Sequence, residues 1–473
     1  MMEWTYSPAL ESREVARLRP HYPMFVDGKF TEGGGEPLTT INPATGTALA
    51  DVSTASAANV DTAVRAARRA YERVWSRMPG AERAKYLLRI ARLIQERARE
   101  LAVLESLDTG TPISASRDVH VPAAAAHFFH HGGWADKLGY AGYGPDPRPF
   151  GVTGQVVSPD AALLSTAWKI APALTCGNTV VLKPAESTPL SALVLAEICQ
   201  QADLPPGVVN VLPGGADIGA ALVAHDGLNK VAFTGSTDVG RQVTRTLAGT
   251  GRSLTLALGG PAVVVVFDDA PLDQAVDGVL AGALGGPLTG SRLLVQESIA
   301  AQLLDMLRTR AAALRIGDPL DKNTDVGAVS SAERLGRIEE LAGNAVAEGA
   351  QRWVGPSPLP DQGFFCSPTL ICDVNQAMRI ATEDIPGPVL PVLTFRTPEE
   401  AAALANHTPT GLAASVWTDK GSRMLWAAQR IRTGVVWSNT ACRFDPTAPF
   451  GGYREAGIGR EGGRAGLQEY LDV

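Results

Sequence analysis

The alternation of short β-branched runs with helical stretches beyond residue 150 constrains the fold of this chain most strongly. Strand-like runs are each followed by a stretch with helical spacing, and a second such segment begins after Leu256. Strands that alternate with helices predict βαβ units and parallel sheets covered on both faces. The predicted strands are Thr179–Leu182, Val208–Leu212, Lys230–Phe233 and Ala262–Phe267, and the helices are Leu190–Gln201, Ile218–Ala224 and one from Val239.

The amino-terminal part predicts a different arrangement. Residues 1–20 are expected to form an irregular, exposed lead-in, and Phe25–Phe30 to form a short hairpin. Apolar residues at helical spacing predict amphipathic helices over Ser56–Val74 and Ala81–Leu107. The Asp108-Thr109-Gly110 cluster is expected to end the second of these helices.

Composition excludes several classes of protein. The 473 residues suffice for two or three domains, and a net charge of -7 without basic runs argues against a nucleic-acid partner. No signal-peptide pattern and no apolar stretch of about 20 residues is present, so no membrane association is expected. The five scattered cysteines form neither a disulfide framework nor a CxxC metal pattern, which favours a cytoplasmic protein. They are Cys176, Cys199, Cys366, Cys372 and Cys442.

The loops after Leu182, Leu212 and Phe233 are the best candidates for a ligand site. Ligands of open parallel sheets lie beyond the carboxyl ends of the strands. Two of these loops contain glycine, and the helix amino termini that follow favour anionic groups such as a pyrophosphate. The pattern therefore indicates a nucleotide site, although glycines that simply turn tight βα corners would look the same.

Five motifs in register make the resemblance to a family specific. Together they resemble the signatures of aldehyde dehydrogenases, in the family's order and over roughly residues 22–473. The motifs are Trp168–Leu174 with Gly177–Glu186, then Val231–Arg241, Gly290-Ser291-Arg292, Gly387-Pro388-Val389 and Pro449–Tyr453.

The resemblance implies an α/β fold with a Rossmann-like NAD-binding domain, an α/β catalytic-type domain and a reduced oligomerisation segment. It assigns 1–21 to an extension, 22–132 and 149–255 to the NAD-binding domain, 256–452 to the catalytic-type domain, and 133–148 with 453–473 to the oligomerisation segment. Lys183 and Glu186 are expected to bind the adenosine ribose, and a carboxylate there favours NAD over NADP. The other cofactor-binding positions implied are Gly215, Ala220, Gly235, Ser236 and Asp384.

The same resemblance places unsuitable residues at the positions that oxidise aldehydes. The nucleophilic cysteine corresponds to Pro287, which has neither a thiol nor the backbone N–H of the oxyanion hole. Asp160 stands where an asparagine donates the second oxyanion hydrogen bond, and Ala257 replaces the general base. Since one lost oxyanion donor costs about 100- to 1000-fold in rate, we expect an inactive homologue that keeps an NAD pocket. Pro386 also replaces an aromatic beside the nicotinamide side.

Three other interpretations stay open. Cys442, with Arg443 beside it, could be a relocated nucleophile of an active NAD-dependent aldehyde dehydrogenase, whereas Thr289 and Ser291 have no adjacent base. Cys176 is expected to be core. His127, His130 and His131 share a helix face, as a zinc site would require, but such histidines more often pack in a core.

A role as a partner subunit is the remaining expectation. The segment Leu138–Phe150 is shorter than the family's oligomerisation hairpin, and the chain stops at Tyr470–Val473, where relatives continue into a pairing strand. The lead-in Tyr6–Ser12 resembles family-16 aldehyde dehydrogenases, some of which lack the catalytic cysteine. The sequence thus predicts a homodimer, or a hetero-oligomer with an active paralogous aldehyde dehydrogenase.

Overall fold

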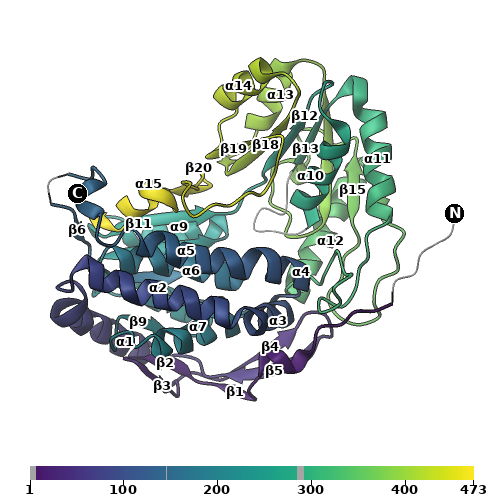
Figure 1. Cartoon of the computed structure of the whole chain (residues 1–473). Helices are drawn as coiled ribbons and strands as arrows, with labels where there is room; N and C mark the ends of the chain where they lie inside the picture. The colour runs from purple at the N-terminus through teal and green to yellow at the C-terminus, as the bar shows by residue number, and fades with distance from the viewer. Residues whose placement is uncertain (1–6, 145, 285–291) are drawn as a thin grey trace.

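Two predominantly parallel β-sheets organise the chain in the computed structural model, which describes residues 7–144, 146–284 and 292–473 (Figure 1). The spatial order of the first sheet is β21-β11-β10-β7-β8-β9-β2-β3, and β7 to β11 are mutually parallel. Its strands are β2 (Met24–Val26), β3 (Lys29–Thr31), β7 (Val152–Val156), β8 (Thr179–Lys183), β9 (Val209–Val211), β10 (Lys230–Gly235), β11 (Ser253–Leu258) and β21 (Gly457–Ile458).

Helices cover both faces of the first sheet, because alternate residues of its strands are apolar on both sides. Val181 faces one helix layer, while Val180 and Leu182 face the other. The first layer is α1 (Ala57–Ala70), α8 (Ala216–Ala224) and α9 (Thr237–Leu247). The second is α2 (Gly80–Glu96), α3 (Ala98–Thr109), α5 (Val121–Gly132), α6 (Ala162–Thr175) and α7 (Leu190–Gln201).

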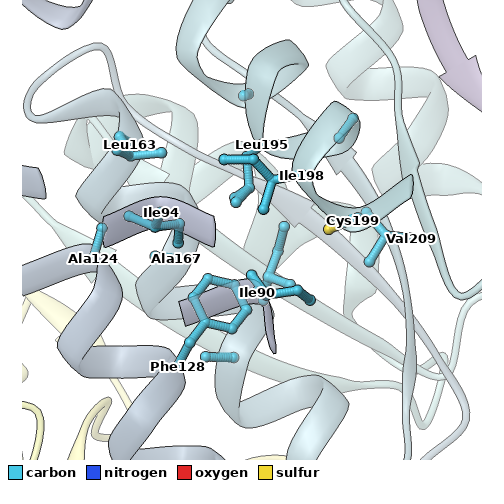
Figure 2. Close-up of a cluster of buried hydrophobic side chains, with 14 of the residues drawn as sticks. Ile90, Ile94, Ala124, Phe128, Leu163, Ala167, Leu195, Ile198, Cys199 and Val209 are labelled. Carbon is cyan, nitrogen blue, oxygen red and sulfur yellow. The ribbon is translucent and has the colours of Figure 1, made fainter. Parts of the chain in front are cut away.

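The second helix layer holds the largest apolar core. Figure 2 shows side chains from four of its helices and from β9 meeting in one cluster. All of the labelled residues are nearly inaccessible to solvent, including the Cys199 thiol, so that cysteine is a core residue. The labelled residues are Ile90, Ile94, Ala124, Phe128, Leu163, Ala167, Leu195, Ile198, Cys199 and Val209.

The second sheet has the order β14-β15-β16-β13-β12-β18-β19, with only β14 antiparallel to its neighbour. Helices α10 (Leu272–Leu284) and α11 (Ala300–Ala312) pack on one face, and α12 (Ala332–Ala347), α13 (Pro398–Asn406) and α14 (Gly421–Arg430) on the other. The strands are β12 (Val263–Val266), β13 (Arg292–Gln296), β14 (Gln351–Val354), β15 (Thr369–Cys372), β16 (Val389–Phe395), β18 (Ala413–Trp417) and β19 (Val435–Ser438).

Smaller elements complete the described residues. A three-stranded sheet joins β1 (His21–Tyr22), β5 (Thr47–Val52) and β4 (Leu38–Asn42), and two strand pairs join β17 to β20 and β22 to β6. The last four are β17 (Thr410–Gly411), β20 (Tyr453–Arg454), β22 (Leu471–Asp472) and β6 (Arg148–Pro149).

Two local predictions are wrong. The single helix predicted over Ala81–Leu107 divides at Arg97, whose φ of -97° and ψ of 16° leave the helical region while its side chain pairs with Glu100 and Glu197. The lead-in is not irregular throughout, since Arg13–Ala16 forms a 3₁₀ turn and Leu10 forms a β-bridge with Asp321.

The predicted hairpin is present, and its turn has a clear physical reason. Phe25 pairs with Phe30, and the two connecting residues, Asp27 and Gly28, have φ of 52° and 75°. An Asp-Gly pair with both φ positive is the preferred two-residue turn between antiparallel strands.

Candidate functional site

A cleft of about 890 Å³ lies at the carboxyl ends of the first sheet's central strands. The strand order reverses between β10 and β7, because the chain continues from β7 to β8 on one side and from β10 to β11 on the other. Such a switch point is where parallel α/β sheets hold their ligands. Among the described residues that line the cleft are Asp160, Trp168, Gly235, Ser236, Ala257, Arg334, Asp384, Phe444, Phe450 and Glu461.

The ends of β8 and β9 bring together Lys183, Glu186 and Gly215. Lys183 is buried and donates from Nζ to the Pro184 carbonyl at 3.0 Å. Burial lowers the pKa of Lys183, although the carboxylates of Glu186 and Asp217 oppose the shift. A Cβ at Gly215 would lie 3.4 Å from Glu186 Oε2 and 3.0 Å from Asp217 Oδ1, so the backbone there runs close beneath the acidic side chains.

Gly235 and Ser236 follow at the end of β10, where both line the cleft. Ser236 caps α9 by accepting a hydrogen bond from the Val239 N–H at 3.4 Å. A Cβ at Gly235 would lie 2.6 Å from Cζ of Phe233, so packing also demands glycine here. The cleft therefore gathers Gly235, Ser236 and Asp384. Lys183, Glu186 and Gly215 lie at the ends of β8 and β9, and the exposed Ala220 lies within α8.

Asp160 does not stand alone in the cleft. Arg334 of α12 donates to both of its carboxylate oxygens, at 2.5 and 2.9 Å, and from the same guanidinium to Ser330 Oγ at 3.1 Å. Asp160, which the resemblance places at an oxyanion-donor position, therefore does not present a bare negative charge, because the planar guanidinium of Arg334 partly neutralises it. Nothing near Asp160 in the sequence signals this partner, which lies 174 residues away.

Asp384 lines the same cleft, close enough to Asp160 and Arg334 for both charges to act on it. Desolvation by the walls, together with the charge of Asp160, raises the pKa of Asp384 to about 6, against the opposing charge of Arg334 and backbone hydrogen bonds from Gly260 and Ile385. Oδ2 of Asp384 would be 2.7 Å from a Cβ at Gly259, so the carboxyl fills the space beside the end of β11. Ala257, which ends in the same space, presents only a methyl group.

The far end of the cleft is aromatic and contains a buried ion pair. Trp168, Phe444 and Phe450 lie with ring centroids 5.3–5.7 Å apart. Glu461, also on the cleft wall, accepts a hydrogen bond from Lys169 Nζ at 2.6 Å. Sequence reasoning missed this pair, although Lys169 lies inside a recognised motif.

Cys442 lies close to this aromatic wall but not among the described residues that line the cleft. Its Sγ is 4.0 Å from the position of a Cβ at Gly282, in α10, and burial raises the pKa of the thiol to about 11. At neutral pH such a cysteine is almost entirely protonated, and the thiol form is a weak nucleophile. Cys176 is buried, as expected of a core residue.

Of the three histidines of α5, His127 and His131 are buried and His130 is half-buried. His127 and His131 stack with ring centroids 5.6 Å apart, and His127 contacts Trp168 at 4.8 Å. Burial lowers the pKa of His131 to about 3, so its ring is neutral at physiological pH. Within residues 7–144, 146–284 and 292–473, no cluster of three or more His, Cys, Asp or Glu side chains is arranged to hold a metal ion.

Several predicted positions lie outside the described residues. Pro287 is among them, together with Thr289 and Ser291. Of the helices in the part of the chain that the structure describes, none is long and apolar enough to cross a membrane.

Comparison with known proteins finds similarity to one family over nearly the whole chain. The model of the aldehyde dehydrogenase family matches residues 30–473. Human retinal dehydrogenase 2 is 39% identical over 458 residues, covering 93% of this chain and 88% of the relative, and an aldehyde dehydrogenase of Alternaria alternata is 38% identical over 95% and 94%. The NAD+ complex of a Bacillus cereus aldehyde dehydrogenase superposes with a TM-score of 0.94, 36% identity and coverage of 99% and 98%.

Proposed function

The chain belongs to the aldehyde dehydrogenase family, and on that premise we propose that it binds NAD without oxidising aldehydes. The observation that carries the proposal is the composition of the reacting end of the cleft, where Ala257 offers a methyl group and Asp160 is held by Arg334. An aldehyde oxidiser of this family needs a thiolate, two oxyanion donors and a base. The matching positions Pro287, Asp160 and Ala257 supply none of them.

The absence of cysteine over a long stretch supports the loss of the nucleophile. No cysteine lies between Cys199 and Cys366, so no shift of the alignment around Pro287 brings a thiol to that position. Cys442 is the remaining candidate, and its raised pKa disfavours the reactive thiolate. We therefore favour the inactive protein over an enzyme that uses a relocated nucleophile.

NAD binding is supported by the sheet edge and by the relatives. A solved relative from Bacillus cereus is described as an NAD+ complex, and one from Sinorhizobium meliloti as NAD-dependent. Here Lys183 and Glu186 would hold the adenosine ribose, Gly215, Gly235 and Ser236 would let the backbone approach the pyrophosphate, and Asp384 would reach the second ribose. The side chains of Asp217 and Glu186 lie close to Gly215, so a ligand has space beside this residue only because glycine has no side chain.

We also propose that the protein is a cytoplasmic partner subunit. The proposed domains are 22–132 with 149–255 for NAD binding and 256–452 for the catalytic-type part, although β11 of the first sheet crosses the boundary at 255 and β21 lies beyond 452. The reduced segments 133–148 and 453–473 meet where β6 pairs with β22, with Arg148 opposite Asp472. A homodimer, or a complex with an active paralogous aldehyde dehydrogenase, would complete such a subunit.

Two measurements on the purified chain test these proposals. Calorimetry should detect NAD binding, and a panel of aldehydes should give no NADH above the buffer rate, with the Cys442→Ala variant unchanged. Robust turnover that Cys442→Ala abolishes would establish the relocated thiol instead. Mass measurement and copurification test the partner role. A chain that stays monomeric and copurifies with no other subunit would exclude that role.

A further inference from the structure

A second, smaller cavity of about 110 Å³ lies behind Asp160. It shares Pro159, Asp160, Arg334 and Pro386 with the cleft. The rest of its described wall comes from the end of α3 and the residues after it, from His120 and Ala161, from the segment that leads into α12, and from Gly387 and Pro388. At about 30 Å³ for each water-sized group, it holds three to four such groups. None of the predicted cofactor contacts Lys183, Glu186, Gly215, Gly235 and Ser236 lies on its described wall, so a ligand in this cavity does not require bound NAD.

Three side chains on its wall have hydrogen-bond donors to spare. Ser330 Oγ accepts from Arg334 at 3.1 Å and keeps its own proton. Arg334 has five N–H groups, of which Asp160 and Ser330 use three.

Thr111 is the third donor. The Thr109 hydroxyl donates to the Glu105 carbonyl at 2.7 Å, shares its proton with Thr111 Oγ1 at 2.9 Å, and accepts from the Thr111 N–H at 3.2 Å. Because Thr111 Oγ1 is the acceptor in this contact, its own proton is able to donate into the cavity that it lines.

Two helix amino termini at the cavity also favour a negatively charged ligand. Ala161, on the cavity wall, precedes the first residue of α6, and Ser330 lies just before α12. The amino ends of such helices attract anions because their first N–H groups have no partner within the helix, and in α6 one of them, the Leu163 N–H, already donates to Glu105. Asp160 is the only carboxylate on the described wall, and Arg334 balances it.

His120 also lies on the cavity wall. Its side chain is 7% exposed, and its Nδ1 lies 3.6 Å from Glu105 Oε1 without a hydrogen-bond partner among the described residues. Glu105 is itself fixed, because its other oxygen accepts from the Leu163 N–H of α6 at 3.1 Å. With Nδ1 facing Glu105, Nε2 is the ring nitrogen left for the cavity.

We propose that this cavity is a binding site for a small carboxylate with about four non-hydrogen atoms, such as acetate. The carboxylate oxygens accept from Thr111, Ser330 and the free edge of Arg334, and the short apolar tail lies against the prolines at 112 and 388. A planar anion with two acceptors satisfies this set of donors, whereas a cation finds only the carboxylate that Arg334 already occupies.

Calorimetry with sodium acetate, exchanged against sodium chloride at constant ionic strength, tests the proposal on the full chain. We expect a Kd in the range of about 1–10 mM, as befits so small a ligand. Thr111→Val and Ser330→Ala should each weaken acetate binding by about tenfold, since each removes one hydrogen bond to a charged group. Arg337→Gln is the matched control, because Arg337 lies one turn along α12 but not on the cavity wall, and should leave the Kd unchanged.

Two further compounds test which property of the ligand matters: neutral acetamide tests the need for a negative charge, and inorganic phosphate tests the limit on size. Acetamide should not compete with acetate, and phosphate should bind more weakly because it is bulkier. Acetate binding that is absent, that is equally strong in Thr111→Val and Ser330→Ala, or that acetamide matches would overturn the proposal. Thermal unfolding of each variant in the absence of acetate shows whether it is folded, and a folded Thr111→Val protein alone suffices to decide.

Discussion

Two regions along the carboxyl edge of the first sheet differ in the kind of contact that each offers to a ligand. At the ends of β8, β9 and β10 the contacts depend on backbone shape and on a Lys–Glu pair, and the glycines are crowded as a close-fitting site requires. At the ends of β7 and β11, chemistry would depend on single side chains, and there Asp160 and Ala257 stand beside Arg334. On the proposed function, the binding surface is kept where the backbone itself builds it, and catalysis is lost because a few side chains differ.

Restoring the reacting end should produce the largest effect. The combination Pro287→Cys, Ala257→Glu and Asp160→Asn returns a thiol, a base and a donor, and should raise NAD-dependent aldehyde oxidation at least about 10³-fold above the wild-type background. Arg334→Gln belongs in the same variant, because Asp160→Asn otherwise leaves the arginine without its partner. The same variant without Pro287→Cys is the control and should stay inactive. A restored variant that binds NAD but gains nothing would mean that more than these side chains separates the two ends.

At the other end of the comparison, Glu186→Gln should weaken NAD binding by about 10- to 100-fold, because a charged acceptor for the ribose hydroxyls is replaced by a neutral one. Calorimetry measures the change. Asp217→Asn is a matched control, since Asp217 is the other carboxylate beside Gly215 and should alter the Kd little. Equal losses in the two variants would indicate a general electrostatic effect instead of ribose recognition.

The Asp160–Arg334 pair should contribute to stability on a smaller scale. Arg334→Met leaves a carboxylate without its cation and should lower the free energy of unfolding by about 1–2 kcal/mol, less than for a fully buried pair because both side chains are partly exposed. Urea unfolding measures this loss, and adding Asp160→Asn should recover most of it. Additive losses in the double variant would contradict a direct pairing.

Asp384 should produce the smallest effect, visible in the pH dependence of stability. Its pKa rises from 3.8 to about 6 on folding, so the folded chain holds the proton more tightly. The resulting stabilisation is present below about pH 4 and is lost as the pH rises through 6. It should stay below about 1 kcal/mol because the side chain opens onto the cleft. Asp384→Asn should remove this slope, and an unchanged slope would assign it to another group.

Much of the fold follows from local patterns, as three elements illustrate. The predicted helix Leu190–Gln201 is confirmed, and the strands β8 and β10 differ from their predictions only at their carboxyl ends. The break at Arg97 was missed because it depends on ion pairs with Glu100 and with the distant Glu197, whereas the apolar spacing continues across it.

The site was less predictable than the fold. Motifs directed attention to Asp160, Gly235 and Asp384, which the structure gathers in one cleft. Arg334 escaped notice because its role arises only when α12 of the second sheet meets the loop after β7 of the first. The small cavity lined by Thr111 and Ser330 is not predictable for the same reason, since its wall comes from segments far apart in the chain.

A single-turnover experiment tests the central claim most directly. The purified chain, in excess over an aldehyde and saturated with NAD, is followed for NADH formation, while calorimetry on the same preparation establishes that NAD is bound. The account predicts bound NAD and no NADH beyond the rate of a protein-free control. NADH formed in proportion to the added aldehyde would contradict it.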